Sequence, residues 1–232
     1  MNATAPFPGF PPHTLSFLHQ LAQNNEREWF HAHRADYESG VLEPALDFIC
    51  AMEAPLAGIS PRFLCIPKRV GGSLLRIYRD TRFARDKRPY KTNIGIHFRH
   101  QDFADIHGPG LYFHVGLDEC FVGGGIWHPE RPVLDKIRQH IIDKPKQWAS
   151  VRTVLTALPG SSFFGESVRR TPPGCPPDHP WLEDLKRKDF VIARPFEAGL
   201  LHEAALHALV VETYATMKPF MKFLCASQGA RF

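Results

Sequence analysis

Apolar residues recur at helical spacing through the first part of the chain. The stretch 14–23 (TLSFLHQLAQ) places its three leucines on one face, which predicts a helix with Thr14 as its N-cap. Asn25 is followed three residues later by Glu28, a spacing that resembles a capping box. This pattern predicts a second helix that runs to about Tyr37.

Helical spacing returns in three further regions. A third helix is predicted from near Pro44 up to Pro55, because proline is tolerated in a first turn and ends a helix elsewhere. Two more are predicted at about 131–142 and 145–156. A last helical region covers about 200–224 and is broken near Pro219.

The middle of the chain changes to a period of two. The stretches 93–99 (NIGIHFR) and 111–117 (LYFHVGL) alternate apolar and polar residues, and the latter forms a predicted hairpin with 120–127 (CFVGGGIW). The stretch 73–79 (SLLRIYR) is predicted as a further strand. One face of this sheet is apolar and is expected to be buried, with Ile94, Ile96, Phe98, Leu111, Phe113 and Val115 on it.

The opposite sheet face collects Arg, Tyr, His and Gly, as a face open to solvent or ligand does. His97 and His114 lie on it, and we interpret them as hydrogen-bonded sheet histidines rather than metal ligands, since no acidic or cysteine partner has ligand spacing. The three consecutive glycines 123–125 favour a bulge or bend over contact with a ligand. The histidines of HEAALH (202–207) are five residues apart, so the zinc-protease motif is not matched. The sequence predicts no metal site and no cofactor.

These elements predict a single α+β domain over residues 1–232, with helices packed on the apolar face of an antiparallel sheet and an irregular segment at 1–10. The first residues lack the basic region of a signal peptide, and no apolar run reaches the roughly 18 residues that cross a membrane. The five cysteines are scattered without a C-x-x-C pair. We therefore expect a reduced, cytoplasmic protein without a membrane partner.

Positive charge is concentrated in one segment. The chain has a net charge of +4, yet residues 62–91 hold ten Lys or Arg against two Asp. The remainder of the chain is therefore mildly acidic. Such a segment, called the basic segment below, concentrates a local field on anionic partners.

Four stretches together resemble one family of bacterial and fungal proteins, the domain of unknown function 2461. They are FLHQLAQNNEREWFHAHRADYE, RIYRDTRFARDKRPYKTNIGIHF, GPGLYFHV with FVGGGIWHPE, and GESVRRTPPGCPPDHPWLEDLKRKDF. They span most of the chain from about residue 10 to 195. The resemblance implies one compact, soluble domain and implies no activity.

The basic segment is the strongest candidate for a site. Arginine forks match phosphate or carboxylate oxygens, and the aromatic residues interleaved with them are not typical of a plainly solvated face. A solvated basic face with its aspartates paired internally is the alternative. The predicted ligand-binding residues are Arg76, Arg79, Arg82, Lys87, Tyr90, Lys91 and Tyr112. Asp80, Asp86 and His114 are the candidates for catalysis, although such aspartates more often hold arginines in place.

The sequence therefore favours a site for an anionic small molecule, most simply a phosphorylated one. A nucleic-acid-binding module that uses the same basic segment remains open, as does an adaptor for an acidic protein surface. Arginines that converge on a small pocket would favour the first reading, whereas cations spread along a groove would favour a polymer.

Overall fold

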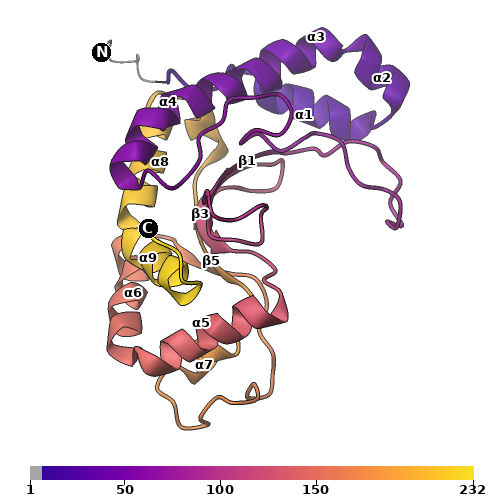
Figure 1. Cartoon of the computed structure of the whole chain (residues 1–232). Coiled ribbons are helices and arrows are strands. Elements are labelled where there is room, and N and C mark those ends of the chain that lie inside the picture. The colour runs from indigo at the N-terminus through magenta and orange to yellow at the C-terminus, as the bar shows by residue number, and fades with distance from the viewer. Residues whose placement is uncertain (1–6) are drawn as a thin grey trace.

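A five-stranded antiparallel sheet forms the centre of the molecule (Figure 1). The computed structural model describes residues 7–232. The strands are β1 (Ile94–Arg99), β2 (Gly110–Val115), β3 (Cys120–Ile126), β4 (Ser162–Phe164) and β5 (Phe190–Pro195), in the order β1-β2-β3-β5-β4. The predicted α+β class is confirmed.

The predicted common apolar face of 93–99 and 111–117 is also confirmed. Ile96 of β1 lies opposite Phe113 of β2, so the apolar positions of both strands share one face. All six residues expected on that face are buried: Ile94, Ile96, Phe98, Leu111, Phe113 and Val115. A shift of one residue would turn this whole set to the other face, so the pattern excludes every odd shift of the pairing.

Helices cover the apolar face of the sheet, and the other face is left open (Figure 1). The covering layer includes α4 (Glu43–Ile59), α5 (Arg131–Asp143), α6 (Pro145–Ala157), α8 (Ala205–Thr216) and α9 (Lys218–Ser227). The remaining elements are α1 (His13–Gln23), α2 (Arg27–Ala32), α3 (Arg34–Tyr37), the π-helix η1 (Glu38–Leu42), α7 (Leu182–Leu185) and the 3-10 helix η2 (Ala198–His202). Large aromatic side chains, among them Trp148 and Tyr214, fill the core between the layers.

The two predicted helix caps near the N-terminus are wrong, and for one reason. Thr14 lies inside α1, where its hydroxyl donates to the Gly40 carbonyl at 2.6 Å. Asn25 precedes the N-cap position of α2 and bonds Tyr90 instead. Both polar side chains satisfy buried backbone groups distant in sequence, a requirement that outweighs local capping.

Helix ends also differ from the sequence prediction. The predicted second helix is interrupted at His33, where α2 ends and α3 begins. Helix α4 continues through Pro55 to Ile59 because Leu56 still packs in the core, which offsets the backbone bond that proline cannot donate. Pro219 lies in the first turn of α9, so the predicted break between the last two helices is confirmed.

Two strand predictions need correction. The stretch 73–79 is not a regular strand, since it pairs only through the isolated bridges Leu74–Ile96 and Tyr78–Tyr90. Strands β4 and β5 were not anticipated. Of the irregular N-terminal segment, residues 7–10 form no regular element, and 1–6 lie outside the described residues.

A candidate ligand pocket on the open face of the sheet

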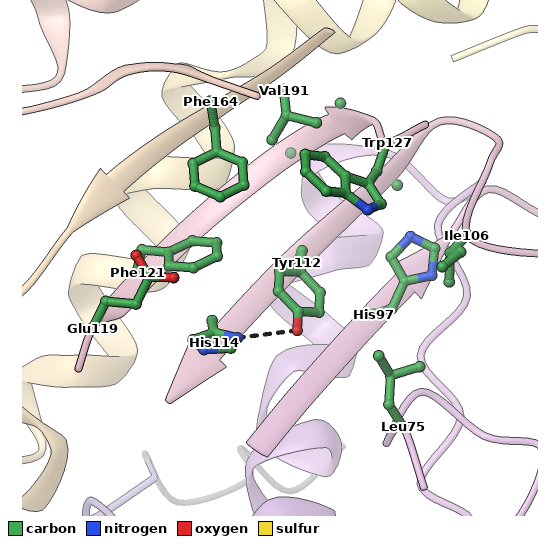
Figure 2. A pocket seen from close by; sticks show the side chains of 13 residues that line it. Leu75, His97, Ile106, Tyr112, His114, Glu119, Phe121, Trp127, Phe164 and Val191 are labelled. Atoms are coloured by element: carbon green, nitrogen blue, oxygen red, sulfur yellow. Dashed lines mark hydrogen bonds between the residues drawn. The ribbon is translucent and has the colours of Figure 1, made fainter. Parts of the chain in front are cut away.

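A pocket of about 300 Å³ lies on the sheet face that carries no helices (Figure 2). This volume is at the lower end of the range for small-molecule sites, about 300–1,000 Å³. Its wall contains neither Lys nor Arg. The lining residues are Leu75, His97, Ile106, Gly110, Tyr112, His114, Glu119, Phe121, Gly124, Gly125, Trp127, Phe164 and Val191.

Three polar rings stand on adjacent strands in this pocket. His97 of β1 is the cross-strand partner of Tyr112, and His114 follows Tyr112 on the same face of β2. The Tyr112 hydroxyl lies 3.1 Å from Nδ1 of His114, a hydrogen bond drawn in Figure 2. The expectation that both histidines share a face is confirmed, with Tyr112 between them.

Glycines on the neighbouring positions make room for these rings. A Cβ atom on Gly95 would lie 2.6 Å from the Tyr112 hydroxyl, and one on Gly110 would collide with the His97 ring. Both contacts would be shorter than real Cβ atoms show. The Tyr112 and His97 rings therefore each lie over a position that must lack a side chain. The alternation of ring and glycine therefore shapes the pocket floor.

Burial keeps the polar rings uncharged. It lowers the pKa of His97 to about 4, helped by the nearby Arg99, and lowers the pKa of His114 to about 4. Burial also raises the pKa of Tyr112 to about 12, with a smaller contribution from Glu119. At neutral pH the three groups are neutral, and each can donate or accept a hydrogen bond.

Aromatic side chains form the pocket wall that begins beside His114. The Phe121 ring stacks on His114 at 4.8 Å between centroids, and Phe164 lies 5.7 Å from Phe121. Trp127 continues the wall, with its ring 5.4 Å from Phe164. A flat apolar body would fit between these rings and the glycine floor.

The three glycines of β3 have structural causes. Gly125 has a φ of +145°, and a Cβ atom there would collide with the Phe190 carbonyl of β5. A Cβ atom on Gly124 would meet Leu111 at 2.9 Å and Met221 at 3.3 Å, on the helix-covered face. A Cβ atom on Gly123 would lie 2.9 Å from the Ile192 carbonyl oxygen. Close packing therefore requires the three glycines, and two of them, Gly124 and Gly125, line the pocket. The expected bulge is not observed as a break in pairing, because β3 pairs continuously with β5.

The predicted cations lie outside the pocket wall, and several are paired with the aspartates. Arg79 Nη1 lies 2.6 Å from Asp86, which also accepts from Arg88 at 2.7 Å, and Arg82 pairs with Asp80 at 2.7 Å. The Arg82 guanidinium lowers the pKa of Asp80 to about 2, and the hydrogen bond from Arg88 also lowers the pKa of Asp86. Both carboxylates are thus held ionised by arginines within the same loop.

The other predicted site residues are distributed between the two regions. Tyr90 is buried with its ring stacked on Phe30 at 4.2 Å, and Lys87 donates to the Thr81 carbonyl at 2.9 Å. Arg76 and Lys91 have no ion-pair partner within residues 7–232. Of the predicted site residues, Tyr112 and His114 alone line the pocket.

Several pocket residues were missed at the sequence level. Val191 belongs to β5, whose residues Phe190–Ala193 are all buried, so the strand shows no alternation. Phe164 belongs to a strand of only three residues. The glycines at 95 and 110 were the one available signal, because isolated glycines in strands often mark close approach of another group.

Residues 7–232 contain neither a cluster of metal ligands nor a membrane-spanning helix. They contain no group of three or more His, Cys, Asp or Glu side chains arranged to hold a metal ion. No helix in this part of the chain has the length and apolar character needed to cross a membrane.

The fold and the pocket define an α+β protein with a ligand-sized cavity on its open sheet face. Residues 13–223 match the model of the conserved hypothetical protein family DUF2461, and the chain belongs to that family. No curated protein and no solved structure matches the chain.

Proposed function

We propose that the protein binds a small molecule in the sheet pocket, with an apolar, flat body and an uncharged polar group at the buried end. The body would lie against Phe121, Phe164 and Trp127. The polar group would bond to the cluster of Tyr112, His114 and His97.

The observation that carries this proposal is the combination of neutral polar rings with a wall free of cations. A ligand carboxylate or phosphate would lose its hydration there without gaining a positive partner. The only charged residue in the wall is Glu119, which would repel an anion. The pocket therefore favours an amide, alcohol or phenol over the anionic group suggested by the basic segment.

Two isosteric probes test this preference. Benzamide and benzoate have the same size and shape, and only benzoate is anionic at pH 7.5. We expect benzamide at millimolar concentration to shift the NMR signals of the His97 and His114 rings, and benzoate to bind at least severalfold more weakly. Tighter binding of benzoate, or no shift of either ring by benzamide at 10 mM, would contradict the proposal.

A variant that narrows the pocket supplies the control. Ile106 lines the pocket and is 39% exposed, so Ile106→Trp should block the cavity without disturbing the core. Val70→Trp makes a similar change at an exposed site on the basic segment. Loss of the benzamide shift in the first variant and its retention in the second are expected.

The setting of the protein belongs to the same proposal. We infer a reducing, cytoplasmic environment, since all five cysteines are free and Cys120 and Cys225 are buried. Binding of an anionic small molecule at the basic segment stays a prediction. Arg76 and Lys91, which lack acidic partners among the described residues, are the cations that would serve it.

A further inference from the structure

Exposed apolar side chains gather in two places on the described surface. Within residues 7–232 the large apolar residues with the greatest exposure are Val70, Tyr78, Phe83, Ile106 and Phe164. Ile106 and Phe164 line the sheet pocket, and the other three lie on the basic segment. Phe83 is 95% exposed, and the Arg82 guanidinium lies 6.0 Å from the centre of its ring. An exposed aromatic ring among arginines is free to stack on a partner.

The basic segment projects from the body of the protein. The stretch that leads into β1 extends away from the helices and the sheet (Figure 1). The two ends of this stretch are held together next to the start of β1. Tyr78 and Tyr90 are bridged to each other, and Lys91 N donates to the Ile77 carbonyl at 2.7 Å. The residues between them, 79–89, form a loop with Phe83 near its middle. The loop can therefore meet a large partner without rearrangement of the sheet.

Two cations of this loop, Arg79 and Arg88, meet on Asp86, and the others are spread along it. Arg85 has no ion-pair partner within residues 7–232, and Lys87 and Arg88 line an open groove of about 440 Å³ between the loop and the start of α2. Arg27 of α2 contributes a further cation to the groove, and Glu26 beside it contributes one carboxylate. Separate cations beside an open groove suit a chain of phosphates better than a single phosphate group.

We propose that the basic segment binds single-stranded nucleic acid, with a base stacked on Phe83 and phosphates bound by Arg85, Lys87 and Arg88. Stacking is tolerant of sequence because every base has a π face, so this mode predicts little base preference. The interaction is independent of the sheet pocket and does not rest on its ligand.

The fixed aspartates favour a single strand over a continuous anionic surface. Asp80 and Asp86 stay ionised in the loop, held by Arg82 and by Arg79 and Arg88. A lipid surface or a broad acidic protein surface would face these carboxylates together with the arginines. A flexible single strand can place its phosphates at the cations and its bases between them.

Fluorescence anisotropy with labelled oligo(dT) and oligo(U) of twenty nucleotides tests the proposal. Binding by three cations predicts a log–log salt slope of about −2, from about −0.7 per phosphate contact for single strands. Phe83→Leu keeps an apolar side chain and removes the aromatic ring, and it should weaken binding roughly fivefold or more. Arg85→Glu should weaken binding further at low salt. Lys136→Glu on α5 makes the same change of charge at an exposed position far along the chain and should have little effect.

Three outcomes would overturn the proposal, and a fourth would show that it is independent of the sheet pocket. No binding of either oligonucleotide at 50 mM salt would remove it. Equal binding by wild type and Phe83→Leu would show that stacking is absent. Tighter binding of a duplex of the same length, or binding of anionic phosphatidylserine vesicles without oligonucleotide binding, would assign the surface to another partner. Loss of benzamide binding in Ile106→Trp with unchanged oligonucleotide binding separates this site from the sheet pocket.

Discussion

Asn25 and Tyr90 pair through two hydrogen bonds, although 65 positions separate them in the sequence. Asn25 Nδ2 donates to the Tyr90 carbonyl, and the Tyr90 N–H donates to Asn25 Oδ1, both at 3.0 Å. Both residues are buried. The Asn25 side chain thus bonds both backbone groups of Tyr90, as a neighbouring strand would. It attaches the end of the basic loop to the turn between α1 and α2.

Removing this side chain should destabilise the protein. Asn25→Ala leaves one buried N–H and one buried carbonyl without partners, and we expect the free energy of unfolding to fall by about 2–4 kcal/mol. Urea denaturation measures the change. The adjacent Asn24 makes one exposed hydrogen bond to Gln20, so Asn24→Ala should cost less than about 1 kcal/mol. Equal effects of the two substitutions would contradict the structural role given to Asn25.

The glycine floor of the pocket should not tolerate a methyl group. Gly95→Ala forces the Tyr112 hydroxyl to move and should weaken its bond to His114, and Gly110→Ala should displace the His97 ring. We expect each to cost about 1–3 kcal/mol and to abolish benzamide binding. The matched control is Gly58→Ala in α4, where a Cβ atom meets nothing within 4 Å and helix propensity favours alanine. It should be neutral or stabilising, and an equal loss there would remove the steric argument.

The buried histidines should make stability depend on pH. The folded pKa values of His97 and His114, about 4, lie below the ordinary value of about 6.5. Between these values the unfolded chain binds more protons, so stability is complete above pH 6.5 and falls as the pH drops towards 4. Each histidine contributes a slope of up to about 1.4 kcal/mol per pH unit. Urea titrations of wild type and His97→Gln at pH 4.5, 5.5 and 7 should show a shallower decline in the variant. An unchanged slope would mean that folding does not lower the pKa of His97.

The arginine–aspartate pairs of the basic loop should contribute little to global stability. Arg82 and Asp80 are mostly exposed, and Arg79 pairs with an Asp86 whose side chain is 37% exposed. No carboxylate would be stranded in the core, so Arg79→Ala and Arg82→Ala should each change stability by less than about 1 kcal/mol. Thermal melts measure this. Unfolding of either variant would show that the loop is part of the cooperative core.

The sequence predicted the helices and strands best where apolar residues follow a single period, either that of a strand or that of a helix. Ile96 and Phe113 could be placed on a common buried face because polar residues alternate with them, and the helices near Leu134 and Trp148 follow from their apolar spacing. Strand β5 was missed because residues such as Val191 and Ile192 are buried on both faces, which removes the alternation.

The candidate site was predicted in part, for a similar reason. Tyr112 and His114 were selected because they lie on the polar face of a recognisable strand. Phe164 and Val191 come from elements far along the chain, and local sequence contains nothing that places them beside Tyr112. The number of charged residues in a segment does not show which of them form ion pairs. The ion pair of Arg82 with Asp80 in the basic loop is therefore seen only in the structure.

A crystal structure of the protein with saturating benzamide tests the central claim most directly. The account predicts the ring between Phe121 and the glycine floor, with the amide within hydrogen-bond distance of Tyr112 or His114. Benzamide bound elsewhere, with the pocket holding only water, would contradict it.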